Sequence, residues 1–385
     1  MTMVLAWLLL AATGLPAQGR FTNVKSETRS AAQGLEREIR AAAARGGIVW
    51  IGYRAPMVAG PRRMCCSDSV TGDGDSSICC GVCRLDGGSV TLSTGNTTRI
   101  ADCGPSPSAA AALGTPGART DCVSRIVLES PTEFLVLARF ENGGITRVRT
   151  FTPDCDIDAG AMTMIWMTDV KPEESIAWLS TLATSTTAAS DGPARERVAK
   201  QAVTAIALHD VAAADRALEG FVAPSQPEWL RSDTAFWLGS ARGEPGARLL
   251  ARMVQQDPSD KVRDKAAFAL SISPAPSALP TLIAAAKDDK SPRVRGQALF
   301  WLARKAGNEA AATITEAIDR DPETEVKKKA VFALSQLPKD EGVPRLIDVA
   351  RNNRNPEVRK QAFFWLGQSK DPRAVQFFED ILLKK

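Results

Sequence analysis

The C-terminal half of the chain repeats its apolar positions at a fixed interval of 32 residues. Phenylalanine recurs at Phe236, Phe268, Phe300, Phe332 and Phe364. Three further series share this interval: Leu238, Leu270, Leu302, Leu334, Leu366; Leu230, Val262, Val294, Val326, Val358; and Leu218, Leu250, Leu282, Ile314, Leu346, Phe378. The region 194–385 has room for six such units.

Each unit carries two helical patterns. Val262, Ala266, Ala269 and Leu270 fall at i, i+4, i+7 and i+8, which places them on one stripe of a helix. A second amphipathic run surrounds Leu250 in one unit and its equivalent in the next. Helix pairs at a fixed period indicate an α-solenoid, because each pair buries its apolar face only by stacking on its neighbours. We therefore expect a right-handed α-solenoid of about six helix pairs over residues 194–385.

A longer period of 64 residues overlies the first. Trp237, Trp301 and Trp365 alternate with Ala269 and Ala333 at the equivalent positions. Large and small residues are therefore expected to alternate along the stack.

Charged residues follow the same repeat. A basic series comprises Arg231, Arg263, Arg295, Lys327 and Arg359, and an acidic series comprises Asp257, Asp289 and Asp321. With Val294-Arg295 and Ala298–Leu302, these positions resemble the HEAT-repeat family, specifically the PBS-lyase HEAT-like repeats. The resemblance covers about half the chain. It implies a solenoid fold and pairing of the two charged series between repeats, but no particular activity.

The phenylalanine series has two interpretations. Phe268 lies six residues beyond Val262, which at 100° per residue puts it on a second face of its helix. That face either packs against the neighbouring repeat or forms an aromatic ridge that lines a partner groove. The candidate binding residues are therefore the five phenylalanines together with Arg263, Arg295, Lys327 and Arg359. For these cations, pairing between repeats and an anion- or peptide-binding stripe are both open.

Residues 20–183 have a mixed pattern that predicts a small α+β domain. The predicted elements are a helix over 24–45, a buried strand over 48–53, a hairpin over 133–152, a strand over 161–167 and a helix over 173–182. The hairpin prediction depends on Asn142-Gly143-Gly144 between two β-prone runs. The polar, aperiodic residues 184–193 indicate a linker to the solenoid.

All eight cysteines lie in the first of these two domains. They are Cys65, Cys66, Cys79, Cys80, Cys83, Cys103, Cys122 and Cys155. An even number of cysteines confined to one segment of an exported chain is typical of a disulfide framework, whose connectivity the sequence does not determine. Alternatively, Cys80-x-x-Cys83 forms half a zinc site or a redox pair.

The N-terminus favours export. Met3–Pro16 is an apolar run, shorter than the roughly 20 residues of a membrane-spanning helix, and a small residue, Ala17, follows it. We interpret residues 1–17 as a cleaved signal peptide, although no Lys or Arg precedes the run. The expected location is extracytoplasmic, either periplasmic or secreted. An uncleaved anchor, or a cytosolic chain with reduced cysteines, is the alternative.

The amino-acid composition argues against several classes of function. The single histidine, His209, excludes sites that need two, including the repeated His-Glu metal pairs of the deoxyhypusine hydroxylases. The formal net charge of +4 does not by itself indicate a nucleic-acid partner. Asp154, Asp156 and Asp158 alternate like the start of a calcium loop, but Ala159 and Ile165 replace the glycine and glutamate that such a loop needs. No cofactor is expected.

These observations favour a non-enzymatic, extracytoplasmic scaffold that binds a protein or peptide on the solenoid surface. The alternative is a thiol-redox or metal-dependent enzyme in the N-terminal domain, with the solenoid recruiting its substrate.

Overall fold

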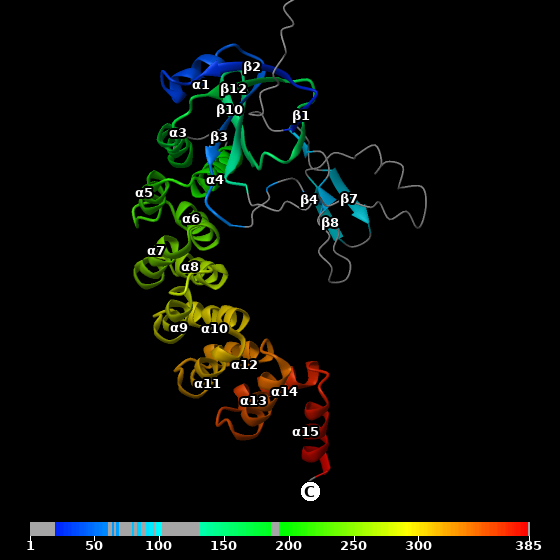
Figure 1. Cartoon of the computed structure of the whole chain (residues 1–385). Helices are drawn as coiled ribbons and strands as arrows, with labels where there is room; N and C mark the ends of the chain where they lie inside the picture. The colour runs from blue at the N-terminus through cyan, green and yellow to red at the C-terminus, as the bar shows by residue number, and fades with distance from the viewer. Residues whose placement is uncertain are drawn as a thin grey trace, which may run out of the picture. The chain divides into compact units, whose positions relative to one another are not determined.

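The computed structural model describes residues 20–60, 64, 67–68, 79–80, 83–85, 90–94, 97–101, 131–185 and 192–383. The chain forms two compact units (Figure 1). One comprises Met1–Trp178 with Asp191–Val198, and the other comprises Leu179–Ser190 with Ala199–Lys385. The expected signal peptide, and most of the expected linker over 184–193, lie outside the described residues.

The first unit is built on a five-stranded sheet of order β10-β9-β3-β12-β2. Its strands are β2 (Lys25–Ser30), β3 (Ile48–Pro56), β9 (Glu133–Glu141), β10 (Gly144–Phe151) and β12 (Thr163–Thr168). Strand β12 runs parallel to β2 and β3, whereas β9 runs antiparallel to β3 and β10. The predicted hairpin is confirmed. Asn142 and Gly143 turn it with φ of 50° and 82°, a backbone conformation that Asn and Gly adopt most readily.

Both faces of this sheet are covered. On one face the side chain of Tyr53 is buried, and its hydroxyl lies 2.7 Å from that of Ser175 on α3 (Pro172–Thr184). On the other face Trp50, Leu135, Leu137 and Trp166 belong to an apolar cluster. Alternate residues of β3 thus enter two separate cores, as the two-residue period of a strand requires. Leu85 and residues of a smaller sheet complete the second cluster.

Short strands accompany the main sheet. The smaller sheet has the order β1-β11-β6 and pairs β1 (Arg20–Thr22) with β11 (Asp156–Asp158) and β6 (Cys83–Arg84). Two further pairs join β4 (Ser67–Asp68) to β5 (Cys79–Cys80), and β7 (Val90–Thr94) to β8 (Thr97–Ala101).

The helix expected over 24–45 is wrong for its first part. Residues Lys25–Ser30 form β2, and the helix α1 occupies only Leu35–Ala43. The sequence KSETRS suits a helix surface, but its backbone pairs with β12 in the register Lys25↔Thr163 to Ser30↔Thr168. Charged side chains are also common on an edge strand, since they discourage pairing with other chains. The apolar stripe of Leu35, Ile39 and Ala42 then begins α1.

The second unit, together with residues 192–198, contains the expected α-solenoid. Its helices are α4 (Gly192–Leu208), α5 (Ala212–Phe221), α6 (Glu228–Ala241), α7 (Gly243–Gln256), α8 (Asp260–Ile272), α9 (Ala278–Asp288), α10 (Pro292–Ala306), α11 (Ala311–Arg320), α12 (Thr324–Ser335), α13 (Lys339–Asn352), α14 (Pro356–Gln368) and α15 (Pro372–Leu383), with a 3₁₀ turn η1 (Gly307–Ala310) before α11. The described residues 192–383 therefore contain six helix pairs, which confirms the period. Val262, Ala266 and Leu270 are fully buried, as the stripe predicts.

The solenoid has two helix layers (Figure 1). The inner helices α6, α8, α10, α12 and α14 pack closely on one another, whereas the outer helices α5, α7, α9, α11, α13 and α15 approach each other less. In a curved stack the layer with the closer spacing lies on the inside of the curve. The inner helices therefore line the concave side.

Candidate binding surface of the solenoid

Aromatic side chains form a continuous row across the inner helices. The row, hereafter the aromatic ridge, comprises Phe236, Trp237, Phe268, Phe300, Trp301, Phe332, Phe364 and Trp365. Neighbouring rings stack from helix to helix: Phe236 on Phe268 at 6.3 Å and Phe300 on Phe332 at 5.5 Å between centroids. Phe268 meets Trp301, and Phe332 meets Trp365, each at 4.7 Å. The ridge thus joins five successive repeats.

The 64-residue period explains how the ridge stays continuous. Phe268 and Phe332 each contact a tryptophan of the following repeat, whereas Phe236 and Phe300 each contact a phenylalanine. The small residues Ala269 and Ala333 follow the phenylalanines of the alternate helices and are fully buried. Large and small residues therefore alternate along the stack, as expected.

The ridge is packed between repeats and also open to solvent. Phe268, Phe300 and Phe332 are half-buried, whereas Phe236 is 39% and Phe364 is 54% exposed at the two ends. Each ring therefore stabilises the stack and presents an edge or face outward. Packing between repeats is what the structure shows, and the partner-groove interpretation stays a prediction.

The two charged series pair with each other, as the family resemblance implies, and each arginine of an inner helix binds the aspartate in the segment that leads to the next helix pair. Arg231 binds Asp257, Arg263 binds Asp289 and Arg295 binds Asp321, each with its Nε 2.7 or 2.8 Å from a carboxylate oxygen. In each pair Nη2 bonds the second oxygen, so the contact is bidentate. Burial raises the pKa of the Asp321 carboxyl. The hydrogen bonds from Arg295 and from the Glu323 backbone outweigh this effect, so the pKa lies below its usual range.

This ladder of ion pairs ends after three repeats. Lys327 donates to the carbonyl oxygen of Asp319 at 2.8 Å, and Arg359 donates to that of Asn353 at 2.8 Å. Asn353 stands where the earlier repeats have aspartate. Of the predicted cationic binding residues, Arg263 and Arg295 are thus buried in ion pairs, which favours the structural interpretation for both.

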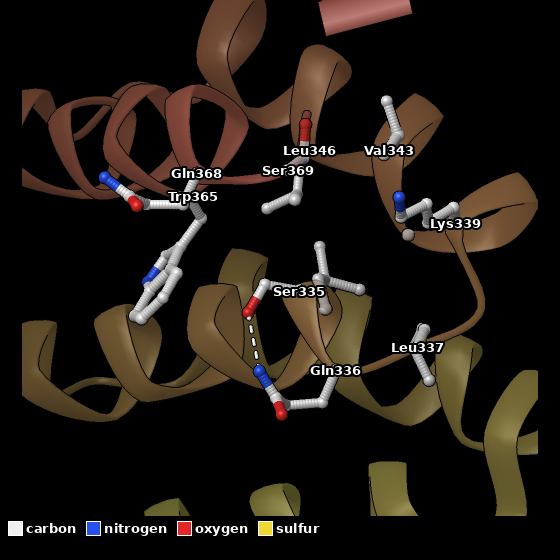
Figure 2. A pocket seen from close by; sticks show the side chains of 11 residues that line it. Ser335, Gln336, Leu337, Lys339, Val343, Leu346, Trp365, Gln368 and Ser369 are labelled. Carbon is white, nitrogen blue, oxygen red and sulfur yellow. Dashed lines mark hydrogen bonds between the residues drawn. The ribbon is translucent and has the colours of Figure 1, made fainter. Parts of the chain in front are cut away.

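A pocket of about 270 Å³ lies between α12, α13 and α14. Figure 2 shows Trp365 and Gln368 at one side of it and Lys339 at the other, with the Gln336 amide bonded to the Ser335 hydroxyl at 3.0 Å. Because Trp365 belongs to the aromatic ridge, the pocket adjoins the C-terminal part of the ridge. The ridge tryptophans are site candidates that the sequence-based prediction missed, although their 64-residue period is visible in the sequence.

The N-terminal candidates are only partly described. Cys155 is buried, and its sulfur lies 3.3 Å from the carbonyl oxygen of Met64. Cys65, Cys66, Cys103 and Cys122 lie outside the described residues, as do the side chains of Cys79, Cys80 and Cys83. Among the described residues no group of three or more His, Cys, Asp and Glu side chains could hold a metal ion. Asp158 instead accepts hydrogen bonds from Asn23 and from the Gly160 backbone.

His209 is fully buried at the end of α4. Its Nδ1 lies 2.7 Å from the carbonyl oxygen of Ala205, and the Arg242 guanidinium donates to its backbone carbonyl at 2.7 Å. Burial, with a contribution from the nearby Arg242 charge, lowers the pKa of His209 to about 4 despite the bond to Ala205. The side chain is neutral at pH 7 and enclosed, which agrees with a structural role.

Taken together, the paired helices, the close inner layer and the ladder of ion pairs define an α-solenoid. Three overlapping matches to the model of HEAT repeats cover residues 215–303, 246–319 and 311–385. Residues 215–385 are HEAT repeats. No helix among the described residues is long and apolar enough to cross a membrane.

Several solved structures resemble the chain. Human deoxyhypusine hydroxylase in complex with glycerol is 15% identical, with 55% of this chain and 91% of that chain covered, at a TM-score of 0.30. The complex of CpcE and CpcF of phycocyanin lyase from Nostoc is 23% identical, with 40% and 99% covered, at 0.30. Kap95p, in a structure with RanGDP, is 17% identical, with 57% and 34% covered, at 0.35. A comparison with curated proteins found no match.

Proposed function

We propose that this protein is a non-enzymatic scaffold that binds a protein or peptide partner on the concave side of its solenoid. The observation that carries the proposal is the aromatic ridge, which runs across five repeats and leaves its rings partly open. Aromatic side chains supply a large contact area at low cost in conformational entropy, and they dominate the energetics of protein interfaces.

The construction of the ridge supports this role. Its rings are held by stacking on neighbouring repeats, so a partner meets a surface that is already ordered. Preorganised surfaces lose less entropy on binding than flexible ones. A solenoid also offers a long, curved surface on which an extended segment can contact several repeats at once.

The extracytoplasmic location belongs to the same proposal. It is supported by the signal-like residues 1–17 and by the eight cysteines, all within the N-terminal domain. We propose that these cysteines form disulfides that stabilise that domain. The enzyme alternative requires a reactive thiol or a metal at Cys80 and Cys83, whose side chains lie outside the described residues.

The test selects peptides that bind the full chain from a phage-displayed library and measures their affinities by fluorescence anisotropy. The double variant Phe236→Ala with Phe364→Ala is expected to lower the affinity for the selected peptides about tenfold or more, because it removes interface hot spots. Val375→Ala is a matched control, because Val375 lies outside the ridge and its 55% exposure equals that of Phe364 within one percentage point.

Two results would contradict the proposal. The first is a set of peptides whose affinity the ridge double variant leaves unchanged. The second is turnover of a substrate by the purified chain without an added partner.

A further inference from the structure

Cationic side chains flank the aromatic ridge on its own face. Side chains three, four and seven residues before a ridge phenylalanine, or four residues after it, share its side of the helix. On the inner helices these positions hold seven cations, which are Lys261, Lys265, Arg293, Arg304, Lys328, Lys329 and Lys360, and four anions, which are Asp233, Asp264, Glu325 and Glu357. This face therefore carries a net charge of +3, nearly all of the +4 of the whole chain.

The charges are not all neutralised within the molecule. Lys261 pairs with Glu228 at 3.6 Å, Arg293 with Asp264 at 3.6 Å, and Lys328 with Glu325 at 3.0 Å. Among the described residues, no ion pair within 4.0 Å involves Lys265, Arg304, Lys329 or Lys360. These four residues, hereafter the ridge cations, contrast with the buried, fully paired Arg263 and Arg295.

One ridge cation lies over a ring of the ridge, and another lies over a glycine one helical turn before that ring. The Arg304 guanidinium carbon lies 6.0 Å from the centroid of Phe300, within the range of a cation–π contact. The side chain of Lys329 on α12 crosses to α10 and lies over Gly296, where a Cβ atom would approach the Lys329 Cδ to 2.3 Å. Glycine at this position therefore leaves room for the lysine beside the ridge. Arg304 thus keeps positive charge beside a partly exposed ring of the ridge.

From this charge complementarity we infer that the partner segment is acidic and carries aromatic side chains. The inference rests on the proposed function and specifies the chemistry of its partner. Partner rings pack on the ridge, and carboxylates between them meet the ridge cations. Adjacent packed helices lie about 8–10 Å apart, and an extended chain rises about 3.3 Å per residue, so about three partner residues span one repeat.

This spacing defines a probe that the full-length protein can be tested with. The peptide repeats Trp-Glu-Glu four times, and its matched controls replace both glutamates by glutamine or by lysine, or tryptophan by alanine. Fluorescein-labelled peptides are titrated at two salt concentrations and followed by anisotropy. We expect the Trp-Glu-Glu peptide to bind at least tenfold more tightly than the glutamine peptide, with an affinity that falls as salt rises.

The corresponding protein variant is Lys265→Gln, Lys329→Gln and Lys360→Gln combined. We expect it to lower the affinity for the Trp-Glu-Glu peptide about tenfold and to reduce the salt dependence, while the affinity for the glutamine peptide stays unchanged. The control variant combines Arg252→Gln, Lys287→Gln and Arg320→Gln, three exposed cations of the outer helices. It removes the same charge and is expected to leave the affinity unchanged.

Each contrary outcome identifies what fails. The inference of an acidic partner is overturned by any of three results. These are equal affinity for the glutamic acid and glutamine peptides, a preference for the lysine peptide, and no binding of any of these peptides. The library selection above still decides the proposed function in those cases. The alanine peptide or single-stranded oligothymidylate could also bind tightly, with an affinity that Phe364→Ala does not change. That result would show that the surface attracts any polyanion, and it would also overturn the inference.

Discussion

At the scale of single residues, one arginine side chain joins the two segments that connect its helix pair to the neighbouring pairs. Arg263 is 2% exposed, binds Asp289 with two hydrogen bonds, and donates a third to the backbone carbonyl of Asp257 at 2.9 Å. The sequence showed the two charged series, and the family resemblance implied their pairing. The burial of the pairs, and the backbone carbonyl that each arginine also satisfies, depend on how closely the repeats stack.

Arg263→Met is expected to lower the free energy of unfolding by about 3–5 kcal/mol, because it leaves the carboxylate of Asp289 buried and unpaired. Lys261→Met is the matched control on the same helix. Its side chain is 64% exposed and its ammonium lies 3.6 Å from the Glu228 carboxylate, so the expected loss is below about 1 kcal/mol. Urea unfolding followed by circular dichroism measures both. Equal losses would show that the buried pair contributes no more than a surface pair.

His209 makes stability depend on pH. Its pKa is about 4 in the folded chain and about 6.5 in the unfolded chain, so the unfolded chain binds the proton first as pH falls. Stability is therefore lost progressively between pH 6.5 and about 4, by about 3 kcal/mol in total. His209→Gln is expected to remove this loss, so the difference in unfolding free energy between wild type and variant changes across that range. A difference that is constant from pH 7 to 4 would contradict the assignment.

At the scale of elements, the sequence predicted those whose signal is local. The 32-residue period predicted the solenoid because each helix there packs only on its neighbours, and Asn142-Gly143 predicted the hairpin because a turn is set by its own residues. Strand β2 was missed because its conformation depends on pairing with β12, about 140 residues away. The ridge phenylalanines were predicted, but the tryptophans beside them were treated only as packing residues.

Close approaches between helices depend on particular glycines. A Cβ atom at Gly342 on α13 would lie 2.4 Å from the backbone oxygen of Leu334, whereas at Gly367 on α14 it would meet nothing within 4 Å. Gly342→Ala is expected to lower the unfolding free energy by about 1–3 kcal/mol, since the backbone must move. Gly367→Ala is expected to be neutral or to raise it by up to about 1 kcal/mol, through helix propensity. Thermal unfolding distinguishes them, and the same sign for both would contradict this close approach.

At the scale of the whole molecule, two kinds of stabilisation divide between the two units. The solenoid contains no cysteine and is held by stacked apolar stripes and ion pairs. The N-terminal domain holds all eight cysteines within 91 residues. Small domains with modest cores commonly depend on covalent links. The proposed disulfides would therefore stabilise only one of the two units.

Reduction of the disulfides is expected to destabilise the N-terminal unit but not the solenoid, so the two units should unfold in separate transitions. Each disulfide removed costs about 2–5 kcal/mol in a small secreted domain, so a reducing agent should unfold the N-terminal sheet and expose the buried Trp50 and Trp166. Their loss of ordered packing is read from near-ultraviolet circular dichroism. The helical signal at 222 nm should keep its melting temperature.

Thiol alkylation and intact mass before reduction provide the control, because four disulfides leave no cysteine to react. Alkylation of all eight cysteines without reduction would refute the disulfides, whereas a parallel fall in the helical transition would show that the solenoid depends on the N-terminal unit.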